Sequence, residues 1–327
     1  ALDSSGDIMA FASDTAPLVT RMMKQRAHVK SALSQKSYDL IASHFALYTL
    51  PILGLIKQYP LVVHFHGPWA DESLVEGDGM RAYNIKKLIE RRVYANADAF
   101  IVLSTAFRRV LVADYGIPES KIRIVPGGVD LDSFDCGLSQ VEARRKLGWG
   151  NDQTIIVSVR RLARRMGIEN LIDAVRHLVD SNPNIRLKIA GKGPLKEEFQ
   201  LRIEQLGLRQ NVELLGYVAE EDLPAIYAAA DLSVVPTVKL EGFGLITLES
   251  LASGTPCLVT PVGGLPEVVG PLSGSLVTAD TSMESLKDSL ESVLFGQTDI
   301  PDAETCRNYA RDNNDWKAVA VKTREVY

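Results

Sequence analysis

Cysteine is scarce in this sequence of 327 residues. The three cysteines, Cys136, Cys257 and Cys306, lie far apart and form no Cys-X-X-Cys pair. An odd, scattered set argues against a disulfide framework and predicts reduced thiols in a cytoplasmic protein. The sequence also shows no secretory signal at its amino end and no apolar run near the roughly 20 residues that a membrane span needs. We therefore expect a protein that is soluble or, at most, rests on a membrane surface.

An excess of basic charge is also missing. The formal net charge is −5 and the pI about 5.7, whereas nucleic-acid-binding domains are usually basic. Residues 1–135 carry 15 Lys and Arg against 15 Asp and Glu, so the acidity lies wholly in the remainder. The hydrophobic content of 46% is that of an ordinary globular protein, and 327 residues suffice for two domains. These numbers argue against a nucleic-acid partner and predict two hydrophobic cores.

Short β-branched apolar runs alternate with longer amphipathic stretches, which is typical of α/β architecture with parallel sheets. The strands predicted in the first part are residues 38–43, 61–65, 99–103 and 122–125. Those predicted in the second part are residues 154–159, 185–190, 212–215, 232–235 and 256–260. The helices predicted between them are residues 82–96, 167–180, 195–206, 221–229 and 244–253. Five strand–helix units in the second part make a complete doubly wound domain.

A Pro-Gly-Gly run at residues 126–128 breaks this pattern, and we place the domain junction near residue 135. The predicted divisions are residues 1–135, 136–305 and 306–327. The last segment ends in a helix from Trp316 to Tyr327 that is expected to fold back onto the first domain. Nothing ahead of Ala10 looks like a strand followed by a glycine-rich turn, so we expect the first domain to be incomplete at its start.

Two acidic residues, Glu241 and Glu249, flank a glycine-bearing stretch between a predicted strand and a predicted helix. Gly242 and Gly244 leave the first N–H groups of the helix uncovered, so this helix start can bind oxygens of an anion or a sugar. Glu249 lies in the helix, where its carboxylate can accept hydrogen bonds from a vicinal diol such as ribose. The alternative is two solvated surface acids, because negative charge is favourable near a helix start.

The stretch 241–249 resembles the glutamate–seven residues–glutamate motif of the retaining GT-B glycosyltransferases of family four. Other stretches that resemble this family are residues 125–130, 216–218, 227–231, 254–256, 263–267 and the closing 316–327. The resemblance runs from about Asp39 to the end of the sequence. It implies the GT-B fold, in which two Rossmann-like domains face a cleft and a C-terminal crossover helix returns to the first domain. The first domain would then be the acceptor side, and the second would bind a nucleotide sugar.

The same resemblance implies roles for single residues. Glu249 would bind the nucleotide ribose, and Glu241 would lie beside the donor sugar as a catalytic residue. The further substrate-binding residues that it implies are Gly242, Phe243, Gly244 and Leu245 beside the donor sugar and Val218 beside the base. The backbone N–H groups of the first three would hold sugar hydroxyls.

Arg161 follows a predicted strand and matches the family arginine that grips the departing diphosphate. A fixed guanidinium there stabilises the charge that the leaving group gains in the transition state. A solvated arginine cluster is the alternative. The family usually has glycine before this arginine and often has lysine five residues after it, where this sequence has Arg160 and Met166. We expect the second cation to come from Arg165 or Lys192.

Histidines end two strands of the first part. His66 matches the family histidine that touches the donor sugar and is a predicted catalytic residue, whereas His64 is interpreted as structural and His44 as a residue of the acceptor side. A histidine pair without a nearby Asp or Cys is a weak metal site. The acidic pair at residues 130 and 132 lies in the linker, which favours a surface turn. We therefore expect neither a metal nor any other cofactor.

A basic run, formed by Lys86, Lys87, Arg91 and Arg92, lies on the helix predicted at residues 82–96. Its apolar positions at helical spacing are Tyr83, Ile85, Leu88, Ile89 and Val93. This pattern predicts a solvated helix with an apolar face toward the core. A peripheral membrane contact at the inner face, useful with a lipid-linked acceptor, is the alternative.

The sequence thus predicts an enzyme that moves a sugar from a nucleotide sugar to a hydroxyl acceptor with retention, in polysaccharide or glycolipid synthesis. UDP-sugars are the first expectation for the donor, from the habit of the family. No nucleophile is evident opposite the leaving group, so front-side attack is the route that the resemblance implies. The alternatives are a non-catalytic nucleotide-sugar-binding protein and a nucleotide-sugar epimerase of the same fold.

Overall fold

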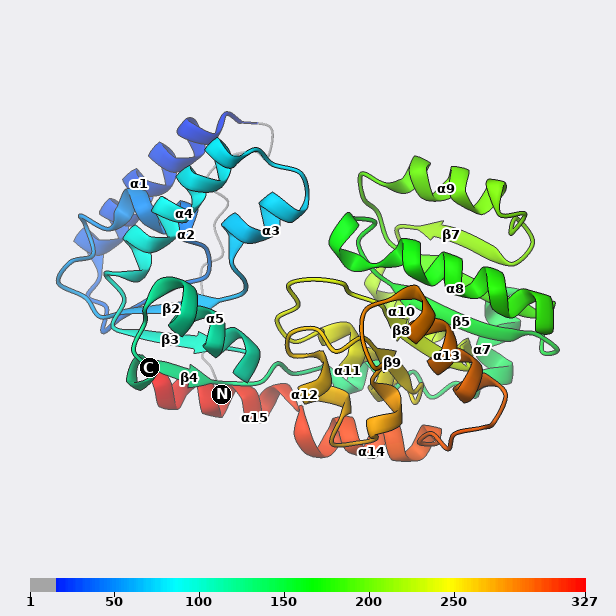
Figure 1. The fold of residues 1–327 in the computed structure, drawn as a ribbon. Helices are drawn as coiled ribbons and strands as arrows, with labels where there is room; N and C mark the ends of the chain where they lie inside the picture. Colours follow the sequence, from blue (N-terminus) through cyan, green and yellow to red (C-terminus); the bar gives the residue numbers. More distant parts are fainter. Residues whose placement is uncertain (1–15) are drawn as a thin grey trace.

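The computed structural model describes residues 16–327 and shows two α/β domains joined by two connections (Figure 1). Each domain contains one sheet, in which all neighbouring strands are parallel. The predicted α/β architecture is therefore confirmed. The strands β2, β5, β6 and β8 have the predicted bounds.

The N-terminal sheet has the order β1-β2-β3-β4. Its strands are β1 (Ile41–Ser43), β2 (Leu61–Phe65), β3 (Ala99–Val102) and β4 (Ile122–Ile124). The helices of this domain are α1 (Leu18–Gln35), α2 (Ala46–Thr49), α3 (Trp69–Val75), α4 (Met80–Tyr94) and α5 (Thr105–Tyr115), with short 3-10 turns η1 (Leu50–Ile52) and η2 (Glu119–Lys121). Phe65, Phe100 and Phe107 lie in its core, at most 2% exposed.

The C-terminal sheet has the order β7-β6-β5-β8-β9. Its strands are β5 (Thr154–Val159), β6 (Ile185–Ala190), β7 (Val212–Gly216), β8 (Leu232–Val235) and β9 (Cys257–Val259). The chain first builds outward from β5 to β7 and then returns to the other side of β5. Ligands of such sheets bind at the carboxyl ends of the strands, beside the point where the order reverses. Here that point lies between β5 and β8.

Helices cover both faces of this sheet. They are α6 (Leu131–Phe134), α7 (Gln140–Leu147), α8 (Ile168–Ser181), α9 (Lys196–Gln205), α10 (Leu223–Ala229), α11 (Leu245–Ala252), α12 (Leu265–Val269) and α13 (Met283–Leu294), with 3-10 turns η3 (Arg164–Met166), η4 (Glu220–Asp222) and η5 (Gly274–Leu276). Ile155 and Ile156, neighbours on β5, belong to two different core clusters. A strand buried on both faces explains the unbroken apolar run in the sequence.

The chain ends in two consecutive helices, α14 (Ala303–Asn313) and α15 (Trp316–Val326). Helix α14 buries Cys306 in the C-terminal core, whereas Val319 and Val326 of α15 pack against the N-terminal sheet. The two connections between the domains touch each other, because Val129 N donates to Asn314 O at 2.9 Å. The returning C-terminal helix of the predicted fold is confirmed as α15, whereas residues 306–313 of the predicted segment 306–327 belong to α14 and pack on the C-terminal domain.

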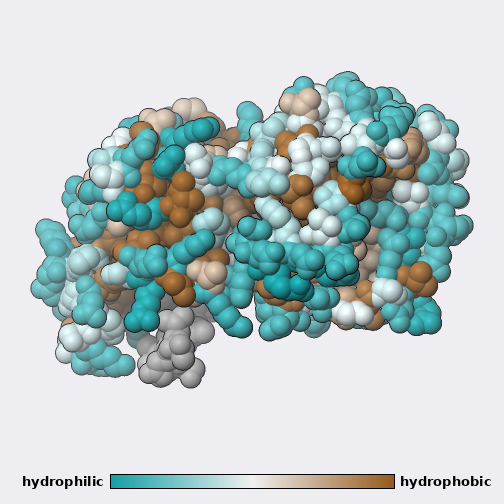
Figure 2. Space-filling model, turned by 90° about the horizontal axis from the view of Figure 1, so that it is seen from below, coloured by the Kyte–Doolittle hydropathy of each residue, from teal (hydrophilic) through white to brown (hydrophobic). Residues whose placement is uncertain are grey.

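Apolar side chains are unevenly distributed over the surface. Most of the large exposed ones belong to the N-terminal domain and to α15. In Figure 2 the hydrophobic surface is largest in the left half, over the N-terminal domain, with smaller areas in the right half. No helix among residues 16–327 is long and apolar enough to cross a membrane.

Helix α4 differs from the predicted amphipathic pattern. Ile85 and Leu88, expected to face the core, are 61% and 69% exposed. Lys87 and Glu90 are buried instead: Lys87 Nζ lies 2.8 Å from Asp71 Oδ2, and Tyr115 Oη donates to Glu90 Oε2 at 2.8 Å. Polar partners on α3 and α5 therefore decide which face of α4 points inward.

Candidate active site

Three loops meet at the carboxyl ends of β5, β6 and β8, where the strand order reverses. Two glycines allow their close approach, because a Cβ at Gly191 would collide with the backbone of Arg160 and one at Gly193 with that of Leu162. Leu162 N also donates to Lys192 O at 2.9 Å. The predicted cationic residues therefore lie at the position where a sheet of this order binds its ligand.

Glu241 lies in the loop between β8 and α11, and its side chain is 14% exposed. Its Oε2 accepts hydrogen bonds from Arg160 Nη2 at 2.5 Å and from Thr237 Oγ1 at 3.2 Å. Its Oε1 has no hydrogen-bond partner among residues 16–327. One oxygen is thus held in place, and the other can accept a hydrogen bond from a ligand.

The loop that leads into α11 presents unpaired backbone donors. The N–H groups of Gly242, Phe243 and Gly244 donate to no residue in the described part of the chain. Gly244 has a φ of 80°, which residues with a side chain rarely adopt. On the other side of this loop, Ser104 Oγ of the N-terminal domain donates to Gly242 O at 2.6 Å. Leu245 follows and is 38% exposed, so the loop offers N–H groups to an oxygen-rich ligand between the domains.

Glu249 lies on α11, and its Oε2 accepts a hydrogen bond from Tyr227 Oη at 3.2 Å. Burial raises the pKa of the Glu249 carboxyl; the hydrogen bond from Tyr227 lowers it, and the negative charge of Glu220 raises it further. The second oxygen of Glu249 has no partner among residues 16–327 and can accept a hydroxyl. Val218, in the loop after β7, is half-buried.

Arg161 and Lys192 are two exposed cations beside the site. The Arg161 guanidinium has no hydrogen-bond or ion-pair partner within the described residues. Lys192 Nζ lies 4.6 Å from the centroid of the Tyr217 ring, in a cation–π contact. Both charges are therefore open to an anionic ligand.

Arg165 is differently engaged. Its guanidinium lies 3.5 Å from a carboxylate oxygen of Glu72 and 3.5 Å from one of Glu76, both from the N-terminal domain, and it donates to Leu240 O at 2.7 Å. Glu76 Oε2 also accepts a hydrogen bond from Arg164 N at 3.3 Å. Glu72 and Glu76 of the N-terminal domain thus form ion pairs with Arg165, the residue that the sequence predicted to bind the donor.

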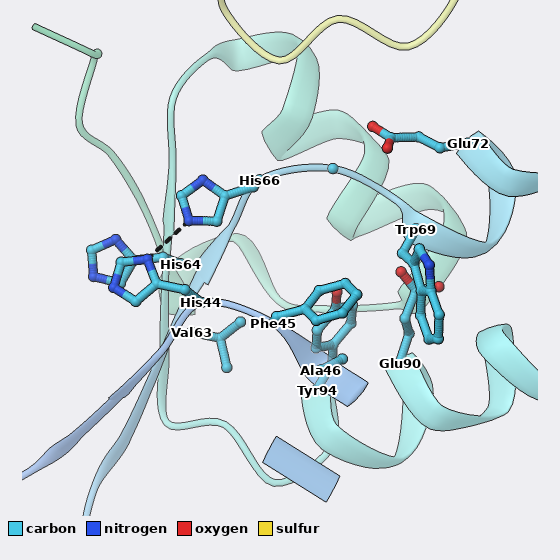
Figure 3. A pocket seen from close by; sticks show the side chains of 11 residues that line it. His44, Phe45, Ala46, Val63, His64, His66, Trp69, Glu72, Glu90 and Tyr94 are labelled. Carbon is cyan, nitrogen blue, oxygen red and sulfur yellow. Dashed lines mark hydrogen bonds between the residues drawn. The ribbon is translucent and has the colours of Figure 1, made fainter. Parts of the chain in front are cut away.

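The N-terminal side of the cleft contains a cavity lined by histidines, aromatic rings and two acids (Figure 3). Its lining residues are His44, Phe45, Ala46, Val63, His64, His66, Gly67, Trp69, Glu72, Glu90 and Tyr94. His44 Nδ1 and His66 Nε2 lie 2.9 Å apart, and the His44 and His64 rings stack at 4.2 Å. His64 Nε2 also lies 2.6 Å from Tyr327 Oη of the last residue. His64, interpreted as structural, therefore lines the same cavity as His66.

Burial lowers the pKa of all three histidines. It lowers that of His64 to about 4, with further contributions from His44 and His66. Burial also raises the pKa of Glu72, which the nearby Arg165 opposes. The three imidazoles are accordingly neutral at pH 7, so they can exchange hydrogen bonds with hydroxyl groups without carrying charge.

Sequence reasoning missed the acids that face the cleft from the N-terminal domain. Glu72 comes six residues after His66, behind a Gly-Pro turn, and an acidic residue so soon after a strand end is the signal that could have pointed to it. The role of Arg160 was also missed, although its departure from the family pattern was noted. Among residues 16–327, no group of His, Cys, Asp or Glu is arranged to hold a metal, and Asp130 caps α6 by accepting from Ser133 N at 3.3 Å.

Two facing α/β domains, a ligand position at the strand ends and a returning C-terminal helix define the GT-B class of proteins. Residues 139–313 match the family model of the group 1 glycosyl transferases, and residues 12–133 match that of Glycosyltransferase Family 4. The chain therefore belongs to the group 1 glycosyl transferases. This membership confirms the predicted family.

The individual relatives agree with this membership. A D-inositol 3-phosphate glycosyltransferase from Corynebacterium jeikeium is 36% identical over 256 residues, which are 74% of this chain and 60% of the relative. Sucrose-phosphate synthase from Thermosynechococcus elongatus has the same fold, with a TM-score of 0.82 and 24% identity over 95% of this chain and 78% of that one. HepE from Anabaena, solved with UDP and glucose, has a TM-score of 0.77 and 21% identity over 96% of this chain and 83% of that one.

These comparisons confirm the predicted GT-B fold. The chain spans about 60% of the length of the first two curated relatives that it matches.

Proposed function

We propose that this protein transfers a sugar from a nucleotide sugar to a hydroxyl acceptor, with retention of configuration at the anomeric carbon. The observation that carries the proposal is the loop of unpaired N–H groups between Glu241 and Glu249. Each of these two glutamates also keeps one carboxylate oxygen free of hydrogen bonds among the described residues. Glu249 binds the ribose diol and Glu241 binds hydroxyls of the donor sugar. Val218 lies beside the base. UDP-sugars are the first donors to test, because HepE was solved with UDP-glucose as well as with UDP and glucose.

The charge that develops on the departing diphosphate needs a counter-charge in the transition state. Arg161 and Lys192, both exposed and in no ion pair among the described residues, supply it in this proposal. The N–H groups of the loop before α11 add their dipoles. The proposed reaction needs no metal ion, and activity is expected to persist in EDTA.

The acceptor is proposed to enter from the N-terminal side. The cavity there offers neutral imidazoles, of which His66 lies at the carboxyl end of β2, and the rings of Phe45 and Trp69. Such a surface suits a hydroxyl group attached to an apolar or ring-shaped body. Because front-side attack forms the new bond on the leaving-group side, the acceptor oxygen and the diphosphate share this part of the cleft.

A lipid-linked acceptor would bring the protein to the cytoplasmic face of a membrane. We propose α4 as the contact, because Ile85 and Leu88 are exposed next to exposed Arg91 and Arg92. Anionic lipids attract such a combination of apolar and basic side chains. Sedimentation with anionic and neutral vesicles tests it: Ile85→Glu with Leu88→Glu should abolish binding to anionic vesicles, and unchanged binding would contradict it.

The decisive experiment is a panel of nucleotide sugars in thermal unfolding, followed by product analysis. A bound donor at 100 times its Kd stabilises the protein by about 2.7 kcal/mol, which is readily detected. NMR of the product then shows whether the anomeric configuration is retained. Stabilisation without transfer or hydrolysis would indicate a binding protein, and an isomerised sugar nucleotide would indicate an epimerase. Either result would contradict the proposal.

A further inference from the structure

Arg160 places a buried guanidinium at the end of β5, where its side chain is 8% exposed. Its Nη2 lies 2.5 Å from Glu241 Oε2, 2.6 Å from Thr237 Oγ1 and 2.8 Å from Met166 Sδ. Its Nε is buried and has no hydrogen-bond partner in the described part of the chain. One nitrogen therefore serves three acceptors, while another donor of the same group is unused.

This contact is the firmest restraint on Glu241. Thr237 adds a longer hydrogen bond of 3.2 Å to the same oxygen. A carboxylate and a guanidinium that are both largely buried depend on each other, because removing either leaves an uncompensated charge away from water. The orientation of Glu241, and of its free oxygen, thus depends on Arg160.

No other cation near the site takes this place. Arg161 is exposed, Arg165 lies between two carboxylates of the N-terminal domain, and Lys192 lies over an aromatic ring. Among the described residues, the hydrogen bonds and ion pairs of Glu241 involve Arg160 as their single cation. The positive charge beside Glu241 therefore comes from Arg160.

Positions 160 and 166 both depart from the family pattern. The family resemblance leads one to expect lysine at position 166 and glycine at 160, but this sequence has methionine and arginine. The Met166 sulfur lies 2.8 Å from Arg160 Nη2, so side chains at the two positions reach the same point from opposite ends of one loop. An ammonium group on a lysine at 166 would occupy the place that the guanidinium takes here.

We propose that Arg160 is a positioning residue that holds Glu241 toward the donor sugar and places beside Glu241 the positive charge that the family resemblance would put at position 166. The inference rests on the proposed function, because it assigns Glu241 to the donor sugar. On this inference, the arginine at position 160 and the methionine at position 166 belong together. The positive charge beside Glu241 comes from one end of the loop and not from the other.

The test uses Arg160→Ala, Met166→Lys in that background, and Arg209→Ala as a control. Arg209 is an arginine of the same domain whose side chain is 71% exposed. With UDP-glucose as the first donor, Arg160→Ala should lower turnover by about 100-fold, the usual loss for a group that organises transition-state charge, and leave UDP affinity within threefold. Adding Met166→Lys should raise the turnover of Arg160→Ala at least tenfold. Arg209→Ala should behave as wild type. A double variant as slow as Arg160→Ala, or a single variant within threefold of wild type, would overturn the proposal.

A second measurement is independent of activity. Thermal unfolding of Arg160→Met, Glu241→Gln and their combination forms a double-mutant cycle. We expect the Tm losses of the single variants to be strongly non-additive, because each already breaks the same pair. Additive losses would show that Arg160 does not hold Glu241. If wild type turns over no nucleotide sugar, the proposed function fails, and this cycle still decides whether Arg160 holds Glu241.

Discussion

Gly263 offers a sharp test of the site geometry. It lies between β9 and α12 with a φ of 58°, and a Cβ added there would lie 2.7 Å from the carbonyl carbon of Glu241 and overlap its oxygen. Ordinary contact begins at 3.4 Å and the oxygen is closer to the added Cβ than the carbon is, so the backbone at Glu241 must move by more than about 1 Å. The neighbouring hydrogen bond from Gly264 N to Glu241 O, 3.1 Å long, moves with it. Gly263→Ala should therefore displace Glu241, a residue of the proposed donor site.

The expected losses have two parts. A side chain in the left-handed region costs about 1–2 kcal/mol of stability. A displacement near 1 Å in a site costs about 100-fold in turnover. Gly207→Ala separates them, because Gly207 has a φ of 71° and no atom within 4 Å of the added Cβ. Both variants should lose stability, and Gly263→Ala alone should lose donor turnover.

The assay follows donor hydrolysis or transfer beside thermal unfolding of both variants. If Gly263→Ala keeps turnover within fivefold of wild type while folded, Glu241 does not need its present place, and the reasoning fails. Equal turnover losses in Gly207→Ala would point instead to a general effect of backbone strain.

Three further predictions concern single side chains. Glu249→Ala should weaken UDP binding about 10–100-fold by calorimetry, because hydrogen bonds to a charged group contribute about 1.5–3 kcal/mol; unchanged affinity would contradict the ribose assignment. Arg161→Ala should lower kcat far more than it raises the donor Kd, and the reverse split would place Arg161 in ground-state binding. The pKa of His64 is about 4 in the folded protein against 6.5 normally, so the unfolded chain binds more protons between these values. Tm should therefore fall as pH drops from 6.5 toward 4, less steeply in His64→Gln, and equal slopes would refute the assignment.

The strands were the most predictable part of the fold. β5 is buried on both faces, and β6 alternates buried apolar residues with half-buried basic ones, so neither sequence fits a helical pattern. The face of α4 could not be predicted in the same way. Periodicity counted Ile85 and Leu88 as core residues, but the polar partners that bury Lys87 and Glu90 come from α3 and α5. Those partners are distant in sequence, and a one-helix pattern contains no information about them.

Distance in sequence also explains why one half of the site was easier to predict than the other. On the donor side, Glu241 and Glu249 belong to one strand–loop–helix unit, so their spacing in sequence already fixes their spacing along one structure. On the acceptor side, His44 and His66 come from the ends of two strands, and Glu90 comes from a helix. Only parallel pairing of β1 with β2 brings the two histidines together.

The pair of Arg160 and Glu241 is intermediate: its members lie 81 residues apart, yet both follow strands that flank the switch point. Strand order therefore predicts that the two loops meet, and the structure shows that Arg160 is the side chain that contacts Glu241.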